Sequence, residues 1–203
     1  MKKGIFLALP LFICLLCEAQ QTNWNYYYTE EFYFIKEVPV LGYRGKNFRY
    51  EIAVKSNPSD TISKVRIHGI SVGKGKDDLL SKDFKVETRK EQDWTIYTII
   101  GKVDDITWKL WFYAAVNGNG HFFFDDLNCY IEEMPGKWRQ LHLYNASFEE
   151  KSSNIFTGYF VSGKYADNIR TAVSSKVFKT GRRSLHVQTR EQKPVLKTDI
   201  AKQ

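Results

Sequence analysis

The sequence predicts an all-β protein, an antiparallel β-sandwich that follows an N-terminal export segment. Aromatic residues make up 15% of the 203-residue chain, and such residues favour strands. Short segments of alternating apolar and polar residues recur along the chain, and clusters of Gly, Asn, Pro and Asp separate them. Because no long stretch beyond the first twenty residues has helical periodicity, the pattern indicates stacked antiparallel strands.

Residues 1–19 have the features of a cleavable signal peptide. Lys2 and Lys3 form a short positive region, and the apolar run Ile5–Leu16 is too short to span a bilayer. Ala19 supplies the small residue expected before a cleavage point. The mature chain is therefore expected to be exported, to the periplasm, the cell surface or the medium, without a transmembrane segment.

The cysteines leave a second interpretation open and exclude a disulfide framework. Acylation of Cys14 or Cys17 would make the chain a lipoprotein, but a small residue does not precede either one. Removal of residues 1–19 leaves Cys129 as the one remaining cysteine, so an internal disulfide is excluded. The net charge of +7 is spread among acidic residues, which is typical of a solvated surface and predicts no nucleic-acid partner.

The main sandwich is expected over residues 20–133. Asn47–Lys55 alternates most clearly, because Phe48, Tyr50, Ile52 and Val54 share one face while Arg49, Glu51 and Lys55 share the other. Turns are expected at Ser56–Asp60 and Asn117–Gly120, and a short helix at Asp77–Ser81. The expected strands, in order, are Glu31–Val40, Asn47–Lys55, Lys64–Val72, Asp83–Arg89, Trp94–Val103, Thr107–Val116 and His121–Glu132.

Residues 134–203 form a separate C-terminal region, because the pattern changes after Glu133. Lys137–Tyr144 and Gly181–Thr189 are the expected strands of this region. In the second of them Leu185 and Val187 share an apolar face that needs a partner surface. The polar tail Arg190–Gln203 is expected to fray.

Two groups of residues resemble the galactose-binding-like jelly rolls, which include carbohydrate-binding modules of secreted bacterial glycosidases. Similar domains precede the catalytic part of some exported bacterial peptidases and esterases. The first group resembles the closing strands of such a domain and the second its opening strands. They are Asp93, Trp94, Tyr97, Lys109–Phe112, Gly118, Gly120 and Phe122–Leu127, and then Asn145, Phe148, Glu149, Gly181, Ser184 and Leu185.

The order of these two groups is reversed relative to the family pattern. Either the C-terminal strands dock on the main sandwich and complete it, or they are a truncated second jelly roll. A complete sandwich needs about 100 residues, more than remain after Asn145. Half a sandwich would expose an apolar face and open edges, so docking is the interpretation we favour.

The sequence predicts no enzyme. No HExxH or phosphate-loop pattern is present, and His68, His121, His142 and His186 are far apart in the chain. Residues 69–73 (GISVG) match GxSxG, but Ser71 lies inside the expected strand Lys64–Val72 and not on the strand-to-helix turn that a nucleophile elbow needs. Adjacent carboxylates such as Asp125 and Asp126 do not supply the two facing carboxyls that a glycosidase needs.

A structural calcium ion is implied by the resemblance alone. Related sugar-binding jelly rolls hold calcium with a carboxylate of the closing strand and oxygens near the start of the domain, which suits a hard cation. The corresponding residues here are Asp125 and Glu149. The alternative is that Asp125 accepts hydrogen bonds from a turn and binds no ion.

The expected ligand face lies on Thr107–Ala115. Alternation separates an apolar set (Trp108, Leu110, Phe112, Ala114) from a mixed set (Thr107, Lys109, Trp111, Tyr113). Sugars stack their C–H faces on aromatic rings beside polar side chains. We therefore predict Trp111 and Tyr113 as platforms with Lys109 as a polar neighbour, although packing beneath a loop or beneath the C-terminal strands would also explain the two rings.

These features favour an exported, non-catalytic module that binds a polysaccharide or glycan. The alternative is an accessory or interaction domain without a sugar site, similar to those that precede peptidase or esterase domains. A structural protein of the cell envelope is a third option.

Overall fold

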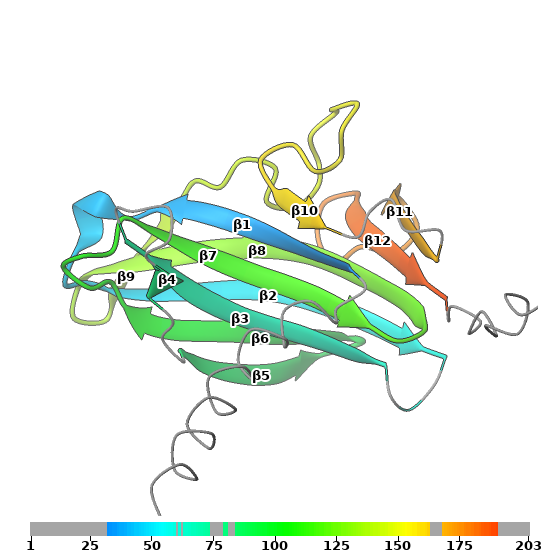
Figure 1. The fold of residues 1–203 in the computed structure, drawn as a ribbon, viewed down its shortest axis with the longest axis horizontal. Coiled ribbons are helices and arrows are strands. Elements are labelled where there is room, and N and C mark those ends of the chain that lie inside the picture. Colours follow the sequence, from blue (N-terminus) through cyan, green and yellow to red (C-terminus); the bar gives the residue numbers. More distant parts are fainter. Residues whose placement is uncertain are drawn as a thin grey trace, which may run out of the picture. The chain divides into compact units, whose positions relative to one another are not determined.

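The chain folds into two antiparallel β-sheets packed against each other, seen in a computed structural model (Figure 1). The structure describes residues 32–59, 61, 63–73, 79–80, 84–162 and 168–190. The expected signal peptide (1–19) and almost all of the expected C-terminal tail lie outside these ranges. The described residues confirm the all-β sandwich predicted from the sequence.

Twelve strands and one short 3-10 helix, η1 (Leu41–Tyr43), make up the described part of the chain. No helix among these residues has the length and apolarity needed to cross a bilayer. The strands are β1 (Phe32–Pro39), β2 (Asn47–Pro58), β3 (Lys64–Val72), β4 (Leu79–Leu80), β5 (Lys85–Glu91), β6 (Trp94–Lys102), β7 (Lys109–Asn117), β8 (Gly120–Met134), β9 (Lys137–Leu141), β10 (Phe160–Ser162), β11 (Ile169–Ser174) and β12 (Ser184–Thr189).

The strand order places β1 and β12, the first and last described strands, in different sheets. The first, five-stranded sheet has the order β10-β1-β7-β3-β4, and the second has the order β11-β12-β8-β2-β6-β5, with β9 also paired to β8. Strand β8 is long enough for β12 to pair with its first half and β9 with its second half. Every pairing is antiparallel, as the turn-rich sequence predicts.

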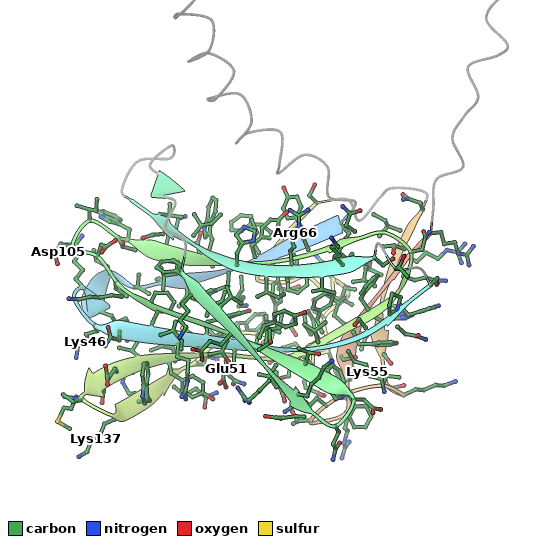
Figure 2. The ribbon with its side chains drawn as sticks, turned by 90° about the horizontal axis from the view of Figure 1, so that it is seen from below. Lys46, Glu51, Lys55, Arg66, Asp105 and Lys137 are labelled. Carbon is green, nitrogen blue, oxygen red and sulfur yellow. The ribbon has the colours of Figure 1, made fainter. Side chains whose placement is uncertain are left out.

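Aromatic rings fill the space between the sheets, and Figure 2 shows side chains crowded into this layer. Tyr50 of the second sheet stacks on Phe112 of the first, with ring centres 3.9 Å apart and planes 5° apart. Phe34 and Phe124 meet edge to face across the same interface at 5.1 Å. The expected alternation of β2 is confirmed, because its apolar set of Phe48, Tyr50, Ile52 and Val54 is buried.

Three of the C-terminal strands, β9, β11 and β12, extend the second sheet, whereas β10 pairs with β1 at the edge of the first. Strand β12 pairs with β8 from Leu185 opposite Phe124 to Thr189 opposite Gly120, and Leu185 and Val187 are fully buried. The segment that precedes β12 packs Val177 against a small cluster that includes Trp94 and Ile96. Trp94 is thus buried, but in a cluster separate from the main core.

The face assignment failed at the start of β7. Trp108 was expected in the core, yet 37% of it is exposed, whereas Thr107 is fully buried and its hydroxyl lies 2.6 Å from that of Ser71. The reason is that β7 begins at Lys109, so strand alternation does not apply to the two preceding residues. The helix expected at residues 77–81 lies largely outside the described ranges, and Leu79–Leu80 pairs with β3 as a strand.

Candidate functional site

The predicted residues Trp111 and Lys109 lie on the outer face of the first sheet. They alternate along β7 with Leu110 and Phe112, which are buried in the core. The strand register places Trp111 opposite Glu37 of β1 and Ile70 of β3. The sequence pattern therefore assigned these two side chains to the correct face.

Glu37 joins the two predicted residues into one cluster of three side chains, Glu37, Lys109 and Trp111, which we call the Trp111 cluster. Its Oε2 accepts a hydrogen bond from Trp111 Nε1 at 2.9 Å and pairs with Lys109 Nζ at 2.7 Å. Lys109 Nζ also lies 5.5 Å from the centre of the Trp111 ring. The carboxylate thus fixes the plane of the indole and the position of the ammonium. Sequence alone did not single out Glu37, because its partners lie more than seventy residues away.

Tyr113 is not an open platform, which corrects the expectation from alternation. It is on the outer face, but only 4% of it is exposed. Its ring stacks on that of Tyr33 at 4.8 Å and lies 4.3 Å from the ring of His68. Bulky residues on the neighbouring strands β1 and β3 cover it, and a single strand's alternation cannot reveal such cover.

An open groove of about 700 Å³ adjoins the Trp111 cluster. One side is the stretch of β1 from Lys36 to Pro39, beyond the part that pairs with β10. The other side is residues 141–144 with residues 158–160, and Tyr43 and Arg139 also line it. Glu37 belongs to both the groove and the Trp111 cluster, so the two are continuous.

Exposed aromatic rings stand along this groove. Phe160 is 55% exposed and Tyr144 is 47% exposed. The ring of Phe160 lies 6.2 Å from that of Trp111. The groove therefore combines exposed rings with the polar side chains of Glu37, Arg139 and His142. This combination suits a ligand with both C–H faces and hydroxyl groups.

A buried lysine holds one wall of the groove in place. Only 3% of Lys36 is exposed, and its Nζ donates hydrogen bonds to the carbonyl oxygens of Tyr144 and, at 3.2 Å, of Gly158. The ammonium also lies 4.2 Å from the centre of the Tyr159 ring. Burial lowers the pKa of Lys36 to about 8. The wall formed by residues 144–160 is thus tied to β1 by a cation.

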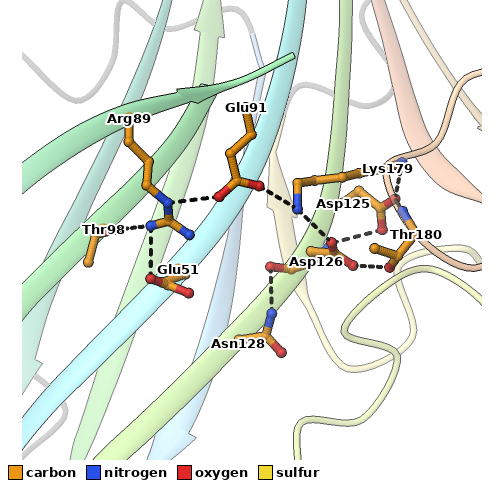
Figure 3. Close-up of polar contacts among 9 residues, drawn as sticks. All are labelled: Glu51, Arg89, Glu91, Thr98, Asp125, Asp126, Asn128, Lys179 and Thr180. Carbon is orange, nitrogen blue, oxygen red and sulfur yellow. Dashed lines mark hydrogen bonds and ion pairs between the residues drawn. The ribbon is translucent and has the colours of Figure 1, made fainter. Parts of the chain in front are cut away.

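The calcium candidates Asp125 and Glu149 both accept hydrogen bonds from backbone N–H groups. Asp125 is fully buried, and its Oδ2 accepts from the N–H of Lys179 at 2.8 Å and of Thr180 at 3.3 Å (Figure 3). Glu149 Oε1 accepts from the N–H of Arg182 and Arg183 at 2.7 and 2.8 Å. These oxygens anchor the segment that precedes β12.

The environment of Asp125 is unusual for a carboxylate. Burial raises its pKa to about 6, against the opposing effect of the backbone hydrogen bonds, which include one from the N–H of Asp126. Among the described residues, no group of three or more His, Cys, Asp or Glu is arranged to hold a metal ion.

Tertiary structure also brings together two histidines that are distant in sequence. His121 Nδ1 and His186 Nε2 lie 2.9 Å apart, across the β8–β12 pairing. His186 also stacks on Phe123 with ring centres 4.5 Å apart. Only the pairing of β12 with β8 creates this contact, so spacing along the chain could not have identified it.

Comparison with known proteins adds no relative. No protein-family model, curated protein or solved structure matches the chain. The similarity to galactose-binding-like domains therefore stays a prediction from the residues.

Proposed function

We propose that this chain is an exported, non-catalytic module that binds carbohydrate through the Trp111 cluster and the adjoining groove. We further propose that its sandwich is a jelly roll of the galactose-binding-like type. One observation carries the functional proposal: Glu37 fixes Trp111 and Lys109 at the rim of an open groove along which Phe160 and Tyr144 are exposed.

The chemistry of a pyranose ring fits this arrangement. Its axial C–H groups pack on aromatic faces, which Trp111 and Phe160 offer 6.2 Å apart. Its hydroxyl groups need planar or charged partners, which Glu37, Lys109 and Arg139 supply at the same rim. The groove is open to solvent and is not an enclosed cavity, so a ligand in it does not need to be a single sugar unit.

A competing role is that of an accessory or interaction domain without a sugar site. The covered ring of Tyr113 favours this role, because it removes one of the two predicted platforms. Under the accessory role, Trp111 would serve packing alone and no glycan would bind.

A glycan-array screen of the purified protein, followed by calorimetry with the best polysaccharide, tests the proposal. Saturable binding that Trp111→Ala and Phe160→Ala each weaken by about tenfold would support it, since about 1.4 kcal/mol corresponds to that factor. Phe178→Ala is the matched control, because Phe178 is an exposed ring outside the groove. Failure of every polysaccharide to bind would leave the accessory role.

A further inference from the structure

A second feature lies on the outer face of the other sheet, centred on Arg49 of β2. Arg49 is opposite Tyr130 of β8 in the strand register. Its guanidinium carbon lies 4.6 Å from the centre of the Tyr130 ring and 5.1 Å from the centre of the Trp138 ring, which β9 supplies. Contact with two aromatic rings restricts the movement of the guanidinium and holds it in one place.

The hydrogen-bonding capacity of Arg49 is unused. A guanidinium carries five N–H donors in its plane, yet none of them donates to an acceptor within the described part of the chain. The nearest anionic oxygen is Oε1 of Glu51, 3.9 Å from Arg49 Nε, which is too long for a hydrogen bond. The Nε atom itself is buried and without a partner. A fixed donor group without an acceptor favours a ligand that provides one.

The neighbouring Glu51 is already engaged by another cation. Its Oε1 accepts a hydrogen bond from Arg89 Nη1 at 3.0 Å, and Arg89 in turn contacts Thr98 and Glu91 (Figure 3). Arg89 is paired with both Glu51 and Glu91, so these groups add no net positive charge to the surface. Because Oε1 of Glu51 is hydrogen-bonded to Arg89, Arg49 keeps its charge without a hydrogen-bonded carboxylate.

Amide side chains complete the surface beside the two rings. Gln140 Nε2 donates to Asn128 Oδ1 at 2.6 Å, and Asn128 Nδ2 donates to the Asp126 carbonyl at 3.1 Å. These bonds fix the orientation of Asn128, whereas Gln140 is exposed on β9. Rings, amides and a fixed guanidinium on one face of the sheet suit a sugar that also carries a negative charge.

We propose that Arg49 anchors a second ligand site, separate from the groove, for the carboxylate of an acidic saccharide such as a uronate unit. The two carboxylate oxygens accept in-plane hydrogen bonds from the two Nη groups of the guanidinium, since Nε is buried, and a lysine cannot reproduce this bidentate arrangement. The rim of Tyr130 and Trp138 contacts the sugar ring, and Gln140 contacts its hydroxyl groups. This site does not depend on the function proposed for the groove.

Calorimetry with a defined oligogalacturonate and with its fully methyl-esterified form tests this assignment, because esterification replaces each charged carboxylate with a neutral methyl ester on the same sugar chain. We expect the acid to bind at least about tenfold more tightly than the ester, as one charge-assisted contact predicts. Arg49→Met should remove that difference, and Arg49→Lys should remove most of it. Arg44→Met is the control for the loss of one exposed positive charge.

Three results would overturn the proposal. One is equal binding of acid and ester by the natural protein. Another is full binding by Arg49→Lys when its melting temperature shows that it is folded. The third is binding of poly-glutamate as tight as that of the oligogalacturonate, which would assign the site to acidic peptides instead. The Trp111→Ala variant should bind the acid normally, so a failure of the groove proposal would be seen separately.

Discussion

The carboxylate of Asp125, fully buried in β8, accepts a hydrogen bond from the backbone N–H of Lys179, 54 residues further along the chain. The same oxygen accepts from the N–H of Thr180, and the side chain of Lys179 pairs with Glu91 and Asp126 (Figure 3). This contact ties the segment before β12 to the middle of the second sheet. The C-terminal strands are thus held by a polar anchor as well as by strand pairing.

Replacing Asp125 with Ala should lower the free energy of unfolding by roughly 1–3 kcal/mol, the cost of leaving buried N–H donors without an acceptor. Urea denaturation, monitored by tryptophan fluorescence, measures this change in the free energy of unfolding. Asp105→Ala is the control, since Asp105 is exposed in a loop and its loss should change stability by less than about 0.5 kcal/mol. Equal stability of the two variants would contradict the role given to Asp125.

Removal of divalent cations should leave the protein unchanged. The Asp125 and Glu149 oxygens that could bind calcium already accept backbone N–H bonds, so EDTA is expected to shift the melting temperature by less than about 1 °C. Differential scanning calorimetry with and without EDTA checks this. A large fall that calcium alone restores would show that an ion binds to the native state.

Lowering the pH should reduce the free energy of unfolding, because His68 becomes protonated. Burial, and secondly the nearby Arg66, lower the pKa of His68 to about 4 from its ordinary 6.5. Because the folded state resists protonation, this contribution to stability is complete above pH 6.5 and is lost as the pH falls through 4. Urea midpoints at several pH values should therefore fall more steeply for the natural protein than for His68→Phe, which keeps a ring against Tyr113. Parallel curves for the two proteins would exclude His68 as the titrating group.

Deleting the chain after Pro135 should give an unstable or insoluble product. The deletion removes β9 and β12, both paired to β8, and exposes the apolar surface that Leu185 and Val187 cover. Burial of each of those side chains contributes roughly 1.5–3 kcal/mol, a large share of the 5–15 kcal/mol that is typical of a domain. Thermal melting and gel filtration are the measurements. A soluble, monomeric product as heat-resistant as the whole chain would show that these strands are dispensable.

Trp111→Ala should reduce polysaccharide binding far more than stability. The indole is half-buried on the outer face and donates one hydrogen bond, to Glu37. Because the substitution removes that bond, we expect the free energy of unfolding to fall by about 1 kcal/mol. Affinity electrophoresis and thermal melting, run side by side, separate the two effects. If the melting temperature fell by many degrees, Trp111 would be a packing residue and the accessory role would gain support.

Strand positions could be predicted from the sequence where a strand has one buried face and one exposed face. In β2 the burial of Phe48, Tyr50, Ile52 and Val54 follows the period-two pattern of the sequence. Short strands without such a pattern were missed, namely β10 (Phe160–Ser162) and β11 (Ile169–Ser174). Ile169 is the one buried residue of the two strands, so neither shows an alternation of buried and exposed side chains. The expected turn at 56–60 began too early, since β2 continues to Pro58 against β8.

The sequence by itself determined the class of fold and the outward direction of Lys109 and Trp111, because alternation is a local property of a strand. Only the tertiary structure decided which side chains meet. It placed Glu37 between Trp111 and Lys109, covered Tyr113 with Tyr33 and His68, and left Arg49 against Tyr130 and Trp138 without an acceptor. Each of these contacts joins residues of different strands, and their distances depend on strand order and register, which one strand's pattern does not contain.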